Sequence, residues 1–103
     1  MKKYKVIFLP SAKNDITEAR KWYRSENISL PSRFTHDLRS IIEILEKRPS
    51  VFSTCYKDVR VAHFKIFPYG LHYLIVHTKI VVLGVFHTSI SPEKWDERYS
   101  KSI

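Results

Sequence analysis

The sequence predicts an α+β fold of the order β-α-α-β-β-β, with two N-terminal helices packed on one face of an antiparallel sheet. Three observations support this prediction. An apolar run opens the chain, two segments before residue 49 carry apolar residues at helical spacing, and three runs rich in β-branched and aromatic residues follow. The breaks between these last runs are short, and short connections favour antiparallel neighbours.

The first two elements are a strand and a helix. Residues 5–9 form a short apolar run that Pro10 closes, so we expect a strand that is buried on both faces. Ser11 then offers a hydroxyl to cap a helix that runs to about Glu26, and Asp15 adds negative charge near its positive end. The apolar face of this helix consists of Ala12, Ile16, Ala19 and Tyr23.

The second helix follows a turn at residues 27–30. Pro31 suits its first turn, where the missing N–H of proline has no partner to lose. Pro49 ends the helix, and residues 50–56 are irregular. Its apolar face consists of Phe34, Leu38, Ile41 and Leu45.

The remaining strands are expected at residues 59–67, 71–78 and 80–86. Successive side chains of a strand point to opposite faces, so alternate residues should meet the helices. Trp95 and Tyr99, four residues apart, indicate a final helical turn that caps the core. The residues expected between helices and sheet are Ile16, Tyr23, Phe34, Leu38, Ile41, Leu45, Phe64, Ile66, Tyr73 and Ile75.

Composition and charge limit the classes of function. The 103 residues are expected to form one domain, residues 1–103, and they carry 18 Lys and Arg against 10 Asp and Glu, a formal charge of +8. This positive charge suits nucleic acid, the ribosome or an acidic protein partner, although it is also consistent with a solvated surface that keeps the protein soluble. The two glycines cannot form a phosphate-binding loop.

The single cysteine, Cys55, has no partner for an intramolecular disulfide or a structural zinc site, which favours a reducing compartment. The apolar run that ends at Pro10 is too short for a signal peptide or a membrane span. We therefore expect a cytoplasmic protein with no membrane partner.

Histidines gather on the predicted sheet, and strand alternation places His63, Lys65 and His72 on its second face, away from the helices. His87 follows the last strand. Imidazole can act as acid or base near neutral pH, although each of these histidines is also consistent with a structural role. Their spacing lacks any metal-binding motif, so no metal is expected.

Motifs over most of the chain resemble the RelE/ParE superfamily, the small bacterial toxins of type II toxin-antitoxin modules, also described as plasmid stabilisation proteins. The order and spacing of the motifs carry the resemblance more than any one of them. The motifs are Leu30-Pro31, Pro49, Phe67-Pro68-Tyr69 with Tyr73, the segment from His87 to Pro92, and Trp95 with Arg98. The resemblance implies the same α+β fold, growth inhibition as the function and no cofactor.

The RelE-like branch implies metal-independent cleavage of messenger RNA on the ribosome, in which cations stabilise the charged transition state. Relatives place arginine where this chain has Gly70 and Ile90. The candidate catalytic residues that survive are His63, Lys65, His72 and His87. The loss of two cations favours binding over catalysis, because the removal of one such group costs on the order of a hundredfold in rate.

The ParE-like branch implies a toxin that inhibits DNA gyrase by binding, with no catalytic constellation. In both branches a cognate acidic antitoxin folds over the toxin and holds it inactive, and exposed apolar residues beside cations would suit this partner. The candidate partner-binding residues are Lys57, Arg60, Leu74 and Arg98. Arg98 could instead pair with a carboxylate of its own chain. A degraded toxin that binds only its antitoxin is a further alternative.

Overall fold

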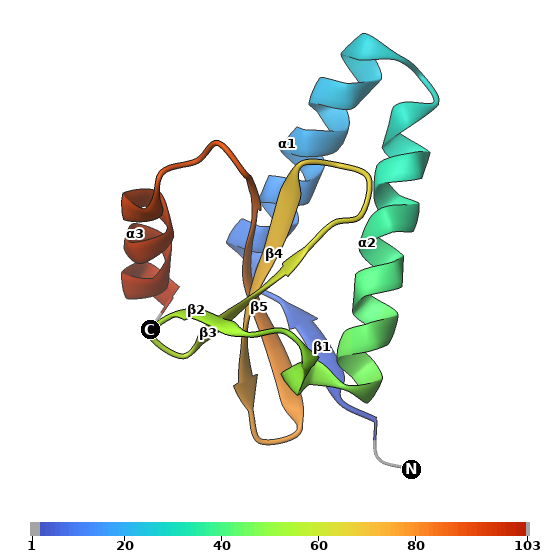
Figure 1. The fold of residues 1–103 in the computed structure, drawn as a ribbon. Coiled ribbons are helices and arrows are strands. Elements are labelled where there is room, and N and C mark those ends of the chain that lie inside the picture. The colour runs from blue at the N-terminus through green and yellow to red at the C-terminus, as the bar shows by residue number, and fades with distance from the viewer. Residues whose placement is uncertain (1–2, 103) are drawn as a thin grey trace.

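The computed structural model describes residues 3–102, which form a sheet with helices on both sides (Figure 1). In chain order the elements are β1 (Lys5–Phe8), α1 (Pro10–Glu26), α2 (Leu30–Lys47), the 3-10 helix η1 (Pro49–Val51), β2 (Thr54–Tyr56), β3 (Val59–His63), β4 (Tyr69–Val76), β5 (Lys79–His87) and α3 (Pro92–Ser102). The α+β class is confirmed, and η1 and β2 lie in the stretch that was expected to be irregular.

The sheet is mixed, which corrects the expectation of an antiparallel sheet. Its order is β1-β5-β4-β3-β2, and the strands from β2 to β5 pair antiparallel as predicted. β1 runs parallel to β5, with Val6 beside Ile80 and Phe8 beside Val82. The prediction rested on short connections, and these say nothing about β1, whose partner is the most distant strand along the chain.

The helices end where the sequence predicted, but α1 begins differently. It starts at Pro10, and its preceding residue, Leu9, makes no side-chain cap, so the expected cap by Ser11 is wrong. Proline suits the first helical position because it lacks the N–H that would otherwise need a cap. Asp15 lies beyond the first turn, and its carboxylate pairs with Arg98 of α3.

The main core lies between the α1-α2 layer and the sheet. Of the ten residues expected there, six are buried, and Ile16, Tyr23 and Ile75 are partly buried against them. Ile66 is the exception, with 65% of its surface exposed.

The physical reason for the error at Ile66 is that β3 ends at His63, so strand alternation stops there. The buried carboxylate of Asp37 accepts hydrogen bonds from the backbone N–H groups of Lys65, Ile66 and Phe67. This contact turns the chain, so that Phe67 enters the core and Ile66 points to solvent.

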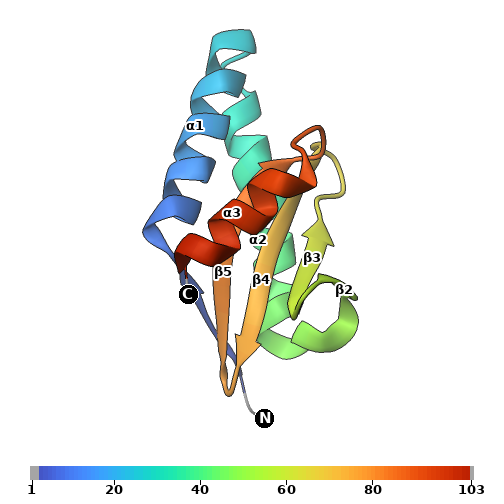
Figure 2. The same cartoon turned by 90° about the vertical axis from the view of Figure 1, so that its left-hand side faces the viewer.

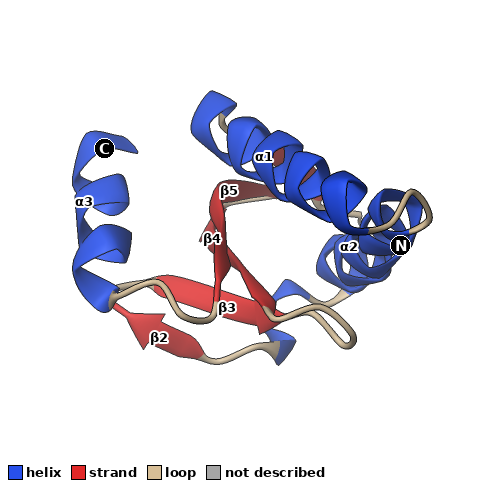
Figure 3. Cartoon of the chain, turned by 90° about the horizontal axis from the view of Figure 1, so that it is seen from above, coloured by secondary structure: helices blue, strands red, loops and turns tan. Residues whose placement is uncertain are grey.

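The second face of the sheet is covered in part by α3, which the sequence predicted only as a single helical turn. Figure 2 shows α3 crossing in front of β5, and Figure 3 shows β4 and β5 between α3 and α2. This helix has no fully buried residue, so single side chains must attach it to the sheet. Among residues 3–102, no helix combines the length and apolar character that a membrane span requires.

Candidate functional site

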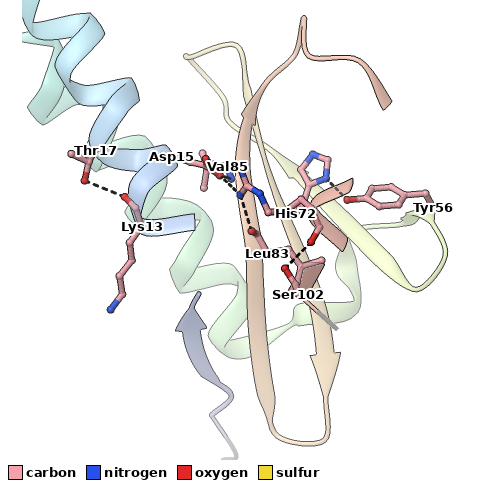
Figure 4. Close-up of polar contacts among 9 residues, drawn as sticks. Lys13, Asp15, Thr17, Tyr56, His72, Leu83, Val85 and Ser102 are labelled. Carbon is pink, nitrogen blue, oxygen red and sulfur yellow. Dashed lines mark hydrogen bonds and ion pairs between the residues drawn. The ribbon is translucent and has the colours of Figure 1, made fainter. Parts of the chain in front are cut away.

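His72 lies on the second face of the sheet but is not open to solvent, which corrects the sequence-based prediction. Only 2% of its surface is exposed. Its Nδ1 and the Tyr56 hydroxyl share a hydrogen bond of 2.9 Å (Figure 4). The rings of Phe86 and Trp95 pack edge to face against the imidazole, at centroid distances of 4.8 and 5.0 Å. Trp95 comes from α3, so the unpredicted length of this helix explains the burial.

This environment keeps His72 uncharged. Burial, together with electrostatic repulsion from His63 and Arg98, lowers the pKa of its imidazole to about 4. Burial also raises the pKa of the Tyr56 hydroxyl, which therefore stays protonated. At neutral pH the pair is a neutral hydrogen bond inside an aromatic cluster.

The other candidate catalytic residues divide into two groups. His63 and His87 line a small pocket of about 120 Å³ together with His72. Nδ1 of His87 accepts a 3.0 Å hydrogen bond from the backbone N–H of Ser89, which places the proton of the neutral ring on Nε2. Lys65 lies beyond the end of β3 and is not part of this pocket.

Gly70 lies on β4 beside the side chains of Val61 and His63 on β3. A Cβ atom at this position would lie 2.9 Å from Cγ1 of Val61 and 3.5 Å from Nδ1 of His63. Any side chain at this position would therefore have to displace the side chain of Val61. Ile90, at the other position where relatives carry arginine, lines a groove between α1 and α3.

Two of the candidate partner-binding residues have partners within the chain. The ammonium group of Lys57 pairs with Asp96 of α3 and lies 4.8 Å from the ring centroid of Tyr99. Arg60 donates to the carbonyl oxygen of Phe52. Lys57 therefore contacts α3, and Arg60 contacts the segment before β2.

Leu74 is half-buried on the second face, beyond the part covered by α3. It lies beside Val81, which in turn lies beside Ile7, and none of the three belongs to the main core. Two residues earlier on the same two strands, and therefore on the same face, Lys5 lies beside Lys79. We call Ile7, Leu74 and Val81 with these two lysines the lysine-flanked stripe.

Arg98 attaches α3 to the rest of the molecule. Its two terminal nitrogens donate to the two carboxylate oxygens of Asp15, at 2.7 and 3.0 Å, and one of them also donates to the carbonyl oxygen of Leu83. The same carboxylate accepts the backbone N–H of Val85 (Figure 4). The guanidinium can lie across β5 because Gly84 has no side chain there: a Cβ would approach it to 3.0 Å. Of the two predicted roles, the structure shows the internal ion pair.

A groove of about 590 Å³ between α1 and α3 was not predicted. Its floor includes Ala19, Val85 and Phe86, and Trp22 stands at its edge with 60% of its surface exposed. In the sequence, the signal of this groove was a tryptophan outside the predicted apolar face of α1, and the groove could not be located without the position of α3.

Comparisons with known proteins bear on this arrangement. Residues 6–92 match the family described as the ParE toxin of type II toxin-antitoxin systems, parDE. The chain belongs to this ParE toxin family. No curated protein matches the sequence.

Solved structures agree with the fold of this ParE-family chain. A chain of the chromosomal ParDE toxin-antitoxin system from P. aeruginosa superposes with a TM-score of 0.67 at 12% identity, covering 82% of this chain and 95% of that one. A chain of the toxin-antitoxin complex RelBE2 from Mycobacterium tuberculosis gives a TM-score of 0.56 at 25% identity, covering 84% and 93%. At 12% identity the first likeness establishes the fold alone.

In this ParE-family chain the structure therefore presents three regions: the imidazole pocket, the lysine-flanked stripe and the α1-α3 groove. Among residues 3–102, no three His, Cys, Asp or Glu side chains gather in a way that could hold a metal ion.

Proposed function

We propose that the chain is a ParE-like toxin that inhibits DNA gyrase by binding and is neutralised by a cognate acidic antitoxin. One observation carries the preference for binding over catalysis: positions 70 and 72, on the face that would hold a nuclease site, offer no catalytic group. His72 is buried and neutral beneath α3, and Val61 fills the space beside Gly70. Neither a cation nor an accessible acid or base is available at these two positions, and phosphate chemistry needs both.

The charge distribution supports the antitoxin partner. A formal charge of +8 attracts an acidic chain over long range, and affinity then requires apolar surface to bury. The lysine-flanked stripe combines both, with Val81 between Leu74 and Ile7 and with Lys5 and Lys79 at one end. The two solved neighbours come from a toxin-antitoxin system and a toxin-antitoxin complex, which agrees with this partner. Binding of this kind uses no cofactor, and we assign the chain to the cytoplasm, where gyrase acts.

Induction of the natural chain tests the proposal. We expect DNA synthesis to stop before protein synthesis in growing cells, and the purified chain to inhibit supercoiling by purified gyrase. Addition of the antitoxin should restore supercoiling, and Leu74→Glu should weaken this rescue because a charge then replaces buried apolar surface. Early arrest of translation with cut messenger RNA would contradict the proposal. No effect on either process would identify a degraded toxin that only binds its antitoxin.

Ribosome-dependent cleavage of messenger RNA is the second candidate, and one observation favours it: His63, His72 and His87 line the same pocket. Substitution of Gly70→Arg with Ile90→Arg restores the two family cations and therefore tests it. We expect no cleavage of ribosome-bound messenger RNA by the natural chain or by this variant.

The same double variant should lose about 1–3 kcal/mol of unfolding free energy in urea denaturation, because the new side chain at position 70 must displace Val61. Ile90→Arg alone is the matched control. It should lose less, since Ile90 borders an open groove. Cleavage that appears only with both arginines would show that the pocket has kept a working site.

A further inference from the structure

A cluster of positive charge lies at one end of the sheet. It is formed around the start of β1, the end of α2 and the turn between β4 and β5, which lie at the lower end of the molecule in Figure 1. Two backbone hydrogen bonds join these segments: the N–H of Tyr4 donates to the carbonyl oxygen of Glu46 at 2.9 Å, and the N–H of Lys5 donates to that of Thr78 at 3.0 Å. The exposed cations of these segments, which we call the basic end, are Lys3, Lys5, Lys47, Arg48 and Lys79.

The cations of the basic end have no carboxylate partner among residues 3–102. The ion pairs in this part of the chain involve Lys57, Lys94 and Arg98, which lie elsewhere. Glu43 and Glu46, in the last turns of α2, are the acidic residues on the three segments, and neither lies within ion-pair distance of the basic end. The excess of positive charge therefore faces solvent and is available to a partner.

The pair of Lys5 and Lys79 indicates that this partner is an anion. These two lysines are register partners on one face of neighbouring parallel strands, and such strands lie about 4.8 Å apart. Like charges placed opposite each other destabilise a sheet. A bound phosphate removes this repulsion, because one negatively charged group can accept hydrogen bonds from both ammonium groups.

We infer that the basic end binds the phosphate backbone of duplex DNA. This inference rests on the proposed function, because gyrase holds DNA and would bring it within reach of a bound toxin. It adds a second component to the target, since the toxin then contacts the enzyme and its DNA together. An antitoxin on the lysine-flanked stripe would cover Lys5 and Lys79, and it would therefore also prevent the contact with DNA.

Duplex DNA fits the basic end better than a membrane surface does. Phosphates follow one another at about 3.4 Å along each strand of a duplex, so several of them can face cations that are spread over three segments. A membrane anchor needs large apolar or aromatic side chains beside its cations. The exposed apolar residues near this end are the valines Val51 and Val76, whose side chains are short, and the aromatic Tyr4 packs against the main core.

Titration of a fluorescent DNA duplex with the purified chain, in the absence of gyrase, tests the inference. Fluorescence anisotropy measures the affinity at several salt concentrations. We expect binding of the natural chain to weaken steeply as salt rises, because each neutralised phosphate releases a counterion. Lys5→Gln with Lys79→Gln should lower the slope of log affinity against log salt by about 2, and should weaken binding roughly tenfold or more at low salt.

The matched control is Lys21→Gln with Arg33→Gln. It removes two positive charges from exposed positions on α1 and α2, near the turn at the opposite end of the molecule (Figure 1), and should leave the slope nearly unchanged. Thermal unfolding verifies the fold of each variant. Lys5→Gln with Lys79→Gln should unfold at the temperature of the natural chain or above it, since two opposed like charges are gone. An equal change of slope in both double variants would overturn the inference.

Inhibition of purified gyrase separates this inference from the proposed function. Lys5→Gln with Lys79→Gln should require roughly tenfold more protein than the natural chain for half-inhibition of supercoiling. Equal inhibition by the two chains, with no DNA binding by either, would overturn the inference and leave the proposed function intact. DNA binding at the basic end without inhibition of gyrase would support the DNA site and overturn the proposed function. Binding to vesicles of anionic phospholipid but not to the duplex would overturn the inference in favour of a membrane partner.

Discussion

Replacement of Asp15 by alanine is expected to lower the free energy of unfolding by about 3 kcal/mol, because the removal of one member of a partly buried, hydrogen-bonded ion pair leaves the other without a partner. The carboxylate accepts two hydrogen bonds from Arg98 and one from the backbone of Val85. It thereby joins α1, α3 and β5 at one point, and both side chains are largely shielded from water. Urea denaturation measures the loss.

A double-mutant cycle with Arg98→Ala isolates the ion pair from the contact to Val85. The matched control is Glu97→Ala, which removes the exposed pair between Lys94 and Glu97, whose charged atoms lie 3.9 Å apart. Exposed pairs contribute little, so this control should change stability by less than about 0.5 kcal/mol. Equal losses in Asp15→Ala and Glu97→Ala would show that the pair does not hold α3 in place.

Acidification from pH 7 to pH 4 is expected to remove about 3 kcal/mol of stability through His72 alone. The pKa of His72 in the folded chain is lowered to about 4 from its ordinary value of 6.5, mainly by burial. Between these two values the unfolded chain binds a proton that the folded chain rejects, so acid favours unfolding. The stability that neutral His72 contributes is complete above pH 6.5. It decreases as the pH falls toward the folded pKa of about 4 and levels off below that pKa.

Urea denaturation at several pH values measures this dependence against His72→Gln, which cannot titrate in the window and can still hydrogen-bond to Tyr56. The variant should show a smaller loss of stability on acidification than the natural chain. His36→Gln, at an exposed position on α2, is the control and should keep the slope of the natural chain. Identical slopes in the natural chain and His72→Gln would show that His72 is accessible to water, and the argument that position 72 offers no catalytic group would fail.

The sequence alone was sufficient for the elements whose signals are local. Apolar spacing located α1 and α2. Pro10 marks the change from β1 to α1, and Pro49 follows the end of α2. Motif order identified the superfamily that the match over residues 6–92 confirms. These features depend on residues that are close together along the chain, so periodicity and turn chemistry are enough to predict them.

Tertiary structure alone decided what the candidate site residues do. Strand alternation correctly placed His72 on the second face, but burial there depends on Trp95 and α3, which lie more than twenty residues later in the chain. Arg98 had two possible roles, and the arrival of Asp15 from α1 selects the internal one. The α1-α3 groove and the parallel pairing of β1 also arise between segments that are distant in sequence. Whether a face is open depends on which distant segment covers it, and periodicity within a single segment contains no information about that.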